Sequence, residues 1–285
     1  RLPRSAREMV DADRRGVPRN ESSAHAAIQA AAAWLCAAQE YSATRDGGVA
    51  RHFDLRTGWG PSYPETTGYI IPTFLALADY FDDAAYRERA IRMVDWLIGI
   101  QLPDGGFQGG TVDAEPVVPV TFNTGQILIG LSVAAREFDD PRALAAARRA
   151  ARFLRDSQDG DGCWRSHPTP FAKPGEKSYE THVSWGLFEA ARAMPEEGYA
   201  EAGYRQVDWA LGNQRPNGWF GKNCLDDPAA PLTHTIGYVL RGVVEAYRLG
   251  GDPRYLDSAT ATADALLSCI DEEGFMPGRL DADWQ

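Results

Sequence analysis

The feature that most constrains the fold is a segment that recurs along the chain. An apolar helix end, a Gln and a Gly-rich turn appear as "WLIGIQLPDGGF" from Trp96, "FLRDSQDGDGCW" from Phe153 and "WALGNQRPNGWF" from Trp209, with a looser "WLCAAQEYSATRDGGV" from Trp34. The aligned positions are Gln39, Gln101, Gln158 and Gln214, with Asp271 in the fifth place, at steps of 62, 57, 56 and 57 residues. So regular a period predicts a repeat architecture.

Each repeat contains two helical patterns. One carries apolar residues on a single side and ends at the Gly turn, where glycine allows the left-handed conformation that closes a helix. The other, as in "GYIIPTFLALADYF", is apolar around most of its circumference and is therefore expected to be buried on most sides. One-sided helices are predicted at 22–40, 84–101, 141–158, 196–214 and 252–270, and the others at 66–82, 122–138, 179–194 and 233–249.

This alternation predicts an all-α fold, an α/α toroid of helical hairpins, in which outer helices shield inner ones. Short links such as "FDDPRA" start the outer helices with Asp or Pro, and the long loops gather at the other end as the mouth of a concave site. We expect an N-terminal extension at 1–20 and a single toroid domain at 21–285. A last inner helix is either missing from this chain or replaced by "SAREMVDADRRG".

Composition limits the classes of partner. The net charge of −11 comes from 40 acidic and 29 basic residues, and no Lys/Arg-rich run is present, which argues against nucleic acid and anionic lipid. No apolar run is long enough for a membrane span, and no signal peptide is visible, which favours a cytoplasmic location. The sequence leaves the oligomeric state open.

The recurring segments resemble the QW motif of squalene and hopene cyclases. In those families the Gln and the aromatic ring tie outer helices together, so the resemblance implies a scaffold role for Trp96, Gln101, Phe153, Gln158, Trp164 and Gln214. The acid motif D-x-D-D of the cyclases is absent, and "DADW" from Asp281 lacks its fourth acid. Related prenyltransferases bind zinc through Asp, Cys and His, but Cys224 and Asp226 fall in an apparent loop near His234, and we predict no metal site.

A second resemblance is to six-hairpin sugar enzymes. The segments "SYPETTGYIIPTFLALADYF" and "SYETHVSWGLFEAA" are similar to the inner-helix starts of unsaturated glucuronyl hydrolases, glycan epimerases, polysaccharide lyases and uronyl C5-epimerases encoded with bacterial surface-polysaccharide machinery. The resemblance implies a saccharide substrate, and the chemistry requires no cofactor.

The candidate catalytic residues lie where the inner helices are expected to begin. Glu65 and Glu180 would divide into acid and base, as glycoside hydrolysis requires, unless each only caps its own helix. His182, His234 and Tyr238 are the alternatives for proton transfer, and Asn123 would orient the substrate.

The long loops supply candidates for substrate binding. These are Tyr63, Trp59, Trp164, Tyr179, Trp219, Lys177 and Lys222, because pyranose faces pack on aromatic rings while hydroxyls and carboxylates bind polar groups. Trp59, Trp164 and Trp219 could equally be packing residues, and Trp34, Trp96, Trp185 and Trp209 are expected in the core.

Together these patterns predict a carbohydrate-active enzyme that hydrolyses, cleaves as a lyase, or epimerises a uronic-acid-containing bacterial surface polysaccharide. A terpenoid-cyclase-like or prenyltransferase-like toroid enzyme and a non-catalytic toroid that binds glycan or protein are the alternatives.

Overall fold

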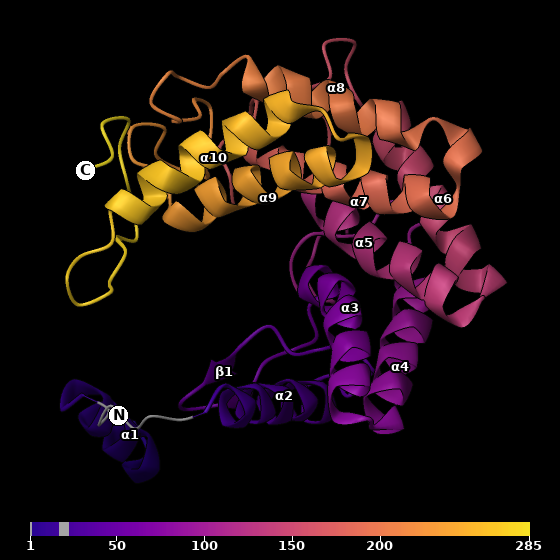
Figure 1. Ribbon diagram of the computed structural model, residues 1–285. Helices are drawn as coiled ribbons and strands as arrows, with labels where there is room; N and C mark the ends of the chain where they lie inside the picture. The colour runs from indigo at the N-terminus through magenta and orange to yellow at the C-terminus, as the bar shows by residue number, and fades with distance from the viewer. Residues whose placement is uncertain (1, 17–22) are drawn as a thin grey trace. The chain divides into compact units, whose positions relative to one another are not determined.

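The computed structural model describes residues 2–16 and 23–285, and helices account for most of them (Figure 1). The helices are α1 (Arg4–Arg14), α2 (Ala24–Glu40), α3 (Pro64–Phe81), α4 (Ala84–Ile100), α5 (Thr121–Phe138), α6 (Pro141–Asp156), α7 (Thr181–Ala193), α8 (Tyr199–Leu211), α9 (Thr233–Gly250) and α10 (Pro253–Ser268). Two 3-10 turns, η1 (Ser178–Glu180) and η2 (Pro195–Glu197), and a hairpin of β1 (Phe53–Asp54) and β2 (Gly58–Trp59) complete the elements. The predicted all-α class and the nine repeat helices are confirmed; the boundary expected after residue 20, like residue 22, lies outside the described residues.

The chain divides into two compact units, which are described separately. The first comprises residues 1–99 and 110–115, and the second comprises residues 100–109 and 116–285. In the described part of the chain, no helix is long and apolar enough to span a membrane.

Asp and Pro start outer helices, as the links between hairpins predict. The Asp140 carboxylate accepts a hydrogen bond from the Arg142 N–H before α6, and Asp252 accepts from the Arg254 N–H before α10. Proline occupies the first helical position in both, where no N–H is needed. The local sequence therefore fixes where these hairpins turn.

Inner helices of the second unit pack with their backbones in close contact. A Cβ on Gly186 of α7 would lie 2.4 Å from the carbonyl oxygen of Gly125 on α5, so only glycine permits this approach. Every residue of α5 from Thr121 to Leu131 is buried, as expected for a helix that is apolar on most faces. This close packing fixes the positions of the helix starts that carry the candidate site.

The repeated Gln joins successive outer helices. In the second unit, the Gln158 amide donates to the carbonyl oxygens of Gly162 in its own turn and Ala202 on α8, both at 2.9 Å. Gln101 makes the same pair of bonds to Gly105 and Ala146, and Gln214 bonds to Gly218 and Ser258. The scaffold role implied by the QW resemblance is confirmed for these glutamines.

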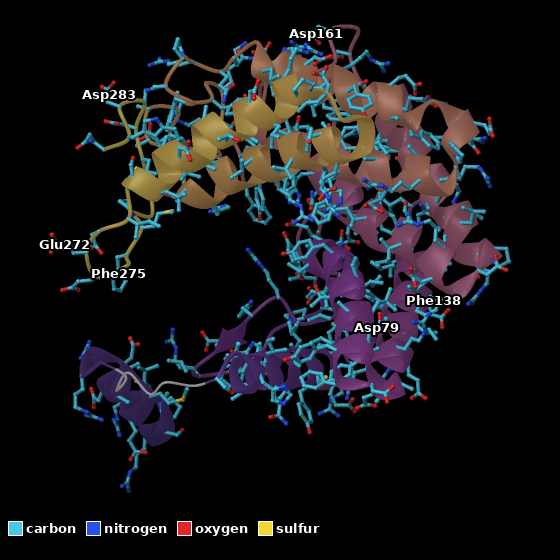
Figure 2. All side chains as sticks on the ribbon, viewed as in Figure 1. Asp79, Phe138, Asp161, Glu272, Phe275 and Asp283 are labelled. Carbon is cyan, nitrogen blue, oxygen red and sulfur yellow. The ribbon has the colours of Figure 1, made fainter. Side chains whose placement is uncertain are left out.

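In the fifth repeat, the position predicted to correspond to the repeated Gln is wrong by one residue. The Asp271 N–H donates to Phe275 and its carbonyl accepts from Gly274, the same bonds that Arg215 makes after Gln214. Ile270, not Asp271, is therefore the counterpart of the Gln. The Asp271 carboxylate caps the turn, while Phe275 is exposed (Figure 2).

The prediction that Trp34 is a core residue is wrong. Its side chain is 55% exposed and contacts Phe53 and Trp59, with ring centroids 5.9 and 4.7 Å away. The β1–β2 hairpin, which the periodicity did not predict, supplies both partner rings. Trp96 is buried as expected, and Trp185 and Trp209 are half-buried.

Candidate active site

Three inner helices of the second unit bring an aromatic cluster together at their starts. Phe122 of α5 is its centre, with ring centroids 5.5 Å from Tyr179, 5.2 Å from Tyr238 and 6.2 Å from His182. His182 lies 4.8 Å from Tyr238, and His234 lies 5.4 Å from the same ring. The convergence predicted from the helix register is therefore present for four candidates. Phe122 itself was overlooked as a site residue, although it shares the register of Tyr179.

The approach of α9 to the start of α7 explains why these rings meet. A Cβ on Gly242 would lie 2.1 Å from the carbonyl oxygen of Thr181, so glycine is required there. The Thr181 hydroxyl donates to the Val239 carbonyl at 3.2 Å and joins the two helices. Tyr238, next to this contact, is thereby held against His182.

The two histidines have different environments. His182 is buried, and its Nδ1 lies 2.6 Å from Oε1 of Gln126, so Nδ1–H donates and Nε2 keeps its lone pair. Burial, assisted by the charge of Arg241, lowers the pKa of His182 to about 3. His234 is exposed, and partial desolvation lowers its pKa too. Both imidazoles are therefore neutral at pH 7, and only His234 is open to solvent.

Glu180 is a buried carboxyl group without a full set of partners. It ends η1 with 6% of its surface exposed, and its Oε2 has no hydrogen bond to any described residue. Burial raises the pKa of Glu180 to about 8, against the opposing charge of Lys177. Its side chain makes no capping bond to α7, so the capping alternative does not account for it. Glu180 is thus protonated at neutral pH and able to donate a proton.

Glu180 lines a small recess in the second unit, of about 10 Å³. Its walls include Trp164, Arg165, Lys177 and Tyr179, together with residues of the loop 166–175. Trp164 is 1% exposed and its ring N–H donates to the Leu154 carbonyl at 2.8 Å, which favours packing over ligand stacking. Lys177 provides positive charge beside a neutral acid, whereas the charge of Arg165 is offset by carboxylates of the protein.

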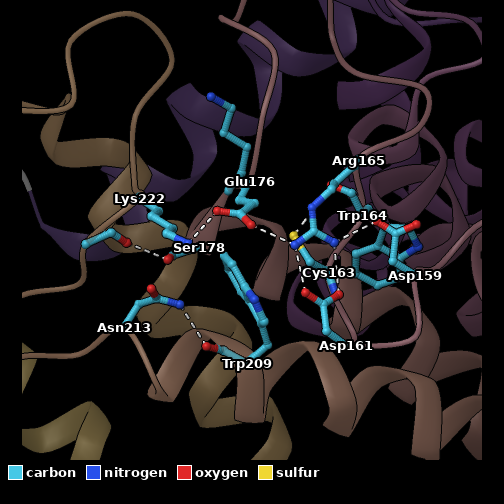
Figure 3. Close-up of polar contacts among 12 residues, drawn as sticks. Asp159, Asp161, Cys163, Trp164, Arg165, Glu176, Ser178, Trp209, Asn213 and Lys222 are labelled. Carbon is cyan, nitrogen blue, oxygen red and sulfur yellow. Dashed lines mark hydrogen bonds and ion pairs between the residues drawn. The ribbon is translucent and has the colours of Figure 1, made fainter.

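An ion pair joins the two residues that flank the loop 166–175, Arg165 and Glu176 (Figure 3). Arg165 pairs with Asp159 and Asp161 at 2.7 Å and with Glu176 at 2.6 Å. Glu176 also binds Lys222, whose ammonium group lies 5.4 Å from the Trp209 ring. Lys222, a candidate for substrate binding, therefore already has partners within the protein.

The remaining candidates of the second unit are enclosed. Asn123 is 2% exposed, and its Nδ2 has no partner among the described residues. Trp219 packs in a core cluster with Ile236, Leu266 and Leu280, which again favours packing over stacking. Asn123 thus keeps an unused donor in the interior of the second unit.

The first unit contains the second candidate carboxylate, Glu65, in the first turn of α3. The Tyr63 hydroxyl donates to Glu65 Oε2 at 2.7 Å, and the Arg51 guanidinium lies 5.4 Å from the Tyr63 ring. Burial raises the pKa of Glu65, while the Tyr63 bond and Arg51 oppose the shift. Trp59 is half-buried and packs on Phe53 at 5.0 Å.

Within residues 2–16 and 23–285, no group of three or more His, Cys, Asp or Glu side chains is placed to hold a metal ion. Asp226, one of the zinc ligands considered above, pairs with Arg279 at 2.9 Å.

A scan against models of protein families found no match, and a search of curated protein sequences found none either. Solved structures do match. They include a sugar epimerase from a ruminal bacterium, at TM-score 0.67 and 13% identity over 86% of this chain and 70% of that one. An unsaturated glucuronyl hydrolase specific for heparin matches at TM-score 0.70 and 15% identity, over 88% and 70%. The cellobiose 2-epimerase of Spirochaeta thermophila matches at TM-score 0.66 and 18% identity, over 98% and 76%.

These matches define the class of fold. The chain has the α/α-toroid fold of the six-hairpin sugar enzymes, as the helix pattern predicted. At identities of 13–18% the likeness concerns the fold, and the activity has to be argued from the residues of this chain.

Proposed function

We propose that this protein is a carbohydrate-active enzyme that acts on an oligo- or polysaccharide, with Glu180 as its general acid. The observation that carries the proposal is the buried Glu180 carboxyl group, whose Oε2 lacks a partner and whose pKa is raised to about 8. Cleavage of a glycosidic bond needs an acid that protonates the departing oxygen, and a carboxyl group kept neutral at pH 7 meets that need.

The composition of the recess supports a sugar rather than a terpenoid. Its walls present Lys177, Ser166 and Thr169 around the acid, groups that bind hydroxyls and carboxylates, whereas Arg165 is already paired with three carboxylates of the protein. A terpenoid substrate would instead need continuous apolar walls. Lys177 beside Glu180 further supports a uronic acid as the sugar that enters, because its ammonium group would pair with the sugar carboxylate.

The histidines bear on which reaction follows. Proton abstraction beside a uronate carboxylate needs a neutral base, and the exposed, neutral His234 suits that role with Tyr238 beside it. A lyase or C5-epimerase would combine this base with Glu180, whereas a hydrolase would combine Glu180 with a second carboxylate. His182, buried and neutral, would hold Tyr238 in place.

The test is incubation with a panel of uronate-containing polysaccharides and oligosaccharides. New reducing ends alone indicate hydrolysis, ultraviolet absorbance of an unsaturated uronate indicates a lyase, and solvent deuterium at C5 indicates epimerisation. The Glu180→Gln and His234→Gln proteins are compared with the parent, and Glu201→Gln, an exposed change on α8, is the control.

We expect one of the three signals from the parent and from the control, and its loss in the Glu180→Gln protein. A parent that binds glycans but gives none of these signals would contradict the enzymatic proposal. A Glu180→Gln protein as active as the parent would remove Glu180 from the mechanism.

A further inference from the structure

The first Gln joint differs from the others in the length of its turn. The Gln39 amide donates to Gly47, eight residues along the chain, whereas Gln101, Gln158 and Gln214 each donate to a glycine four residues away. The longer turn carries Tyr41 and Arg45, both of them exposed. This insertion interrupts the repeat within the first unit.

The longer turn forms a pocket of about 310 Å³, lined by Gln39, Glu40, Tyr41, Arg45, Gly47 and Arg92. Gly47 brings its two sides together, because its φ is +107° and a Cβ there would lie 3.3 Å from the Arg92 carbonyl oxygen and 3.4 Å from the Trp96 Cβ. The turn backbone therefore lies against α4, and Arg45 and Arg92 line one pocket.

Arg92 does not bind the repeated Gln, as the equivalent arginines of the next two repeats do. In the next two repeats the equivalent arginines, Arg149 and Arg205, donate to the Oε1 atoms of Gln101 and Gln158. In the first repeat a different arginine, Arg89, donates a hydrogen bond to the Gln39 Oε1 atom at 3.1 Å. Among the described residues Arg92 has no bond to Gln39, and it lines the pocket instead.

Neither pocket arginine is neutralised by a close carboxylate of its own. Among the described residues, Arg92 has one ion pair, to Glu40 at 4.0 Å, and Glu40 lies closer to Arg89, at 3.4 Å. The Arg45 side chain has no hydrogen bond or ion pair within the described part, and its φ of 49° places the backbone in the left-handed region, which is uncommon for a residue with a side chain.

We propose that this pocket binds a tetrahedral oxyanion, a phosphate or sulfate group, either free or attached to a sugar. Two guanidinium groups offer paired N–H donors that match the oxygens of such an anion, and Tyr41 is among the same lining residues. The inference does not depend on the action of Glu180, because every lining residue belongs to the first unit.

The experiment measures binding of inorganic phosphate and sulfate by calorimetry at constant ionic strength, with chloride as the reference anion. We expect Arg45→Ala and Arg92→Gln each to weaken phosphate binding about tenfold, since each removes a charged donor. Arg56→Ala, an exposed arginine of the same unit, is the matched control and should bind as the parent does. Glu40→Gln removes the competing carboxylate and should tighten binding severalfold.

Melting curves in chloride verify that each variant is folded. Equal binding of chloride and phosphate, or unchanged phosphate binding in both arginine variants, would overturn the proposal. If the Arg45→Ala and Arg92→Gln proteins do not fold, the Glu40→Gln protein decides, because unchanged affinity there contradicts the site. A glucose phosphate or sulfated disaccharide that binds more tightly than the free anion identifies a sugar-borne group, and equal affinity identifies the free anion.

Discussion

Gln158, which joins two outer helices, and Glu180, which lines the recess, are polar side chains that differ in whether their hydrogen-bonding atoms have partners. At the joint the Gln158 amide donates two hydrogen bonds and its oxygen accepts one from Arg205. At the recess the Glu180 carboxyl group is nearly fully enclosed, yet Oε2 has no partner among the described residues. An amide whose atoms are all hydrogen-bonded stabilises the repeat. A buried carboxyl group without a partner stays protonated and lowers stability once it is ionised.

The largest expected effect is on catalysis. Glu180→Gln keeps the shape of the side chain but removes the transferable proton, so we expect glycan turnover to fall about 100- to 10,000-fold. Stability should be unchanged or higher, because a neutral amide replaces a group that is costly to ionise in the interior. Turnover and urea denaturation of the same protein check both parts; a large loss of stability would make Glu180 a structural residue.

For Gln158 we expect the reverse, a loss of stability with little change in turnover. Gln158→Leu leaves the Gly162 and Ala202 carbonyls without their donor, and we expect the free energy of unfolding to fall by about 2–4 kcal/mol. Turnover per folded molecule should stay near that of the parent. Ile270→Gln is the control, since no outer helix follows α10 in the described residues, and it should change stability by less than about 0.5 kcal/mol.

The pH dependence of stability distinguishes the Glu180 recess from the Gln158 contact without any substrate. The pKa of Glu180 is raised from 4.5 to about 8, so between these values the folded state holds a proton that the unfolded state has released. Its stabilisation is complete below pH 4.5 and is lost as the pH rises to 8. His182, lowered from 6.5 to about 3, acts in the opposite sense and only below pH 6.5.

Between pH 6.5 and 8, Glu180 should therefore lower the free energy of unfolding by about 1.4 kcal/mol per pH unit, roughly 2 kcal/mol in all. Urea denaturation at several pH values measures this slope. The Glu180→Gln protein should lose it, and the Gln158→Leu protein should keep it. An equal slope in the parent and the Glu180→Gln protein would contradict the raised pKa.

The smallest effect concerns the carboxylate that does have a partner. Tyr63→Phe removes the hydroxyl that donates to Glu65, and because this bond lowers the pKa of Glu65, its loss should raise that pKa further. We expect a stability change of at most about 1 kcal/mol and less than a tenfold change in turnover. Carbon NMR titration of Glu65 gives the direction, and an unshifted titration would show that the bond is absent in solution.

The helix pattern was predictable because it depends on local spacing. The expected helices at 84–101 and 122–138 differ from α4 (Ala84–Ile100) and α5 (Thr121–Phe138) by a single residue at one end. The contacts of Gln101, Gln158 and Gln214 were predictable for the same reason, because in each of these repeats the glycine follows the Gln by four residues. The alignment of Asp271 was wrong because Gly274 follows it by three residues, whereas Gly105, Gly162 and Gly218 each follow their Gln by four.

The site was only partly predictable. Register along the helices placed Tyr179, His182, His234 and Tyr238 at one end of the second unit, and the structure confirms that they meet. Burial was not predictable, because it depends on how loops fold over the helix starts. Trp164 and Trp34 show this in opposite directions, since the first is enclosed and the second is exposed.

By itself the sequence determined the repeat, the helices and the ends at which they turn, because these follow from spacing, capping and glycine. Tertiary structure alone decided which polar groups find partners. Gln158 and Glu180 are both polar residues at helix ends. The Gln158 amide lies beside two carbonyl groups that accept its hydrogen bonds, whereas Glu180 Oε2 has no hydrogen-bond partner among the described residues. That difference in surroundings sets their protonation and cost of burial, and no property of the residue type predicts it.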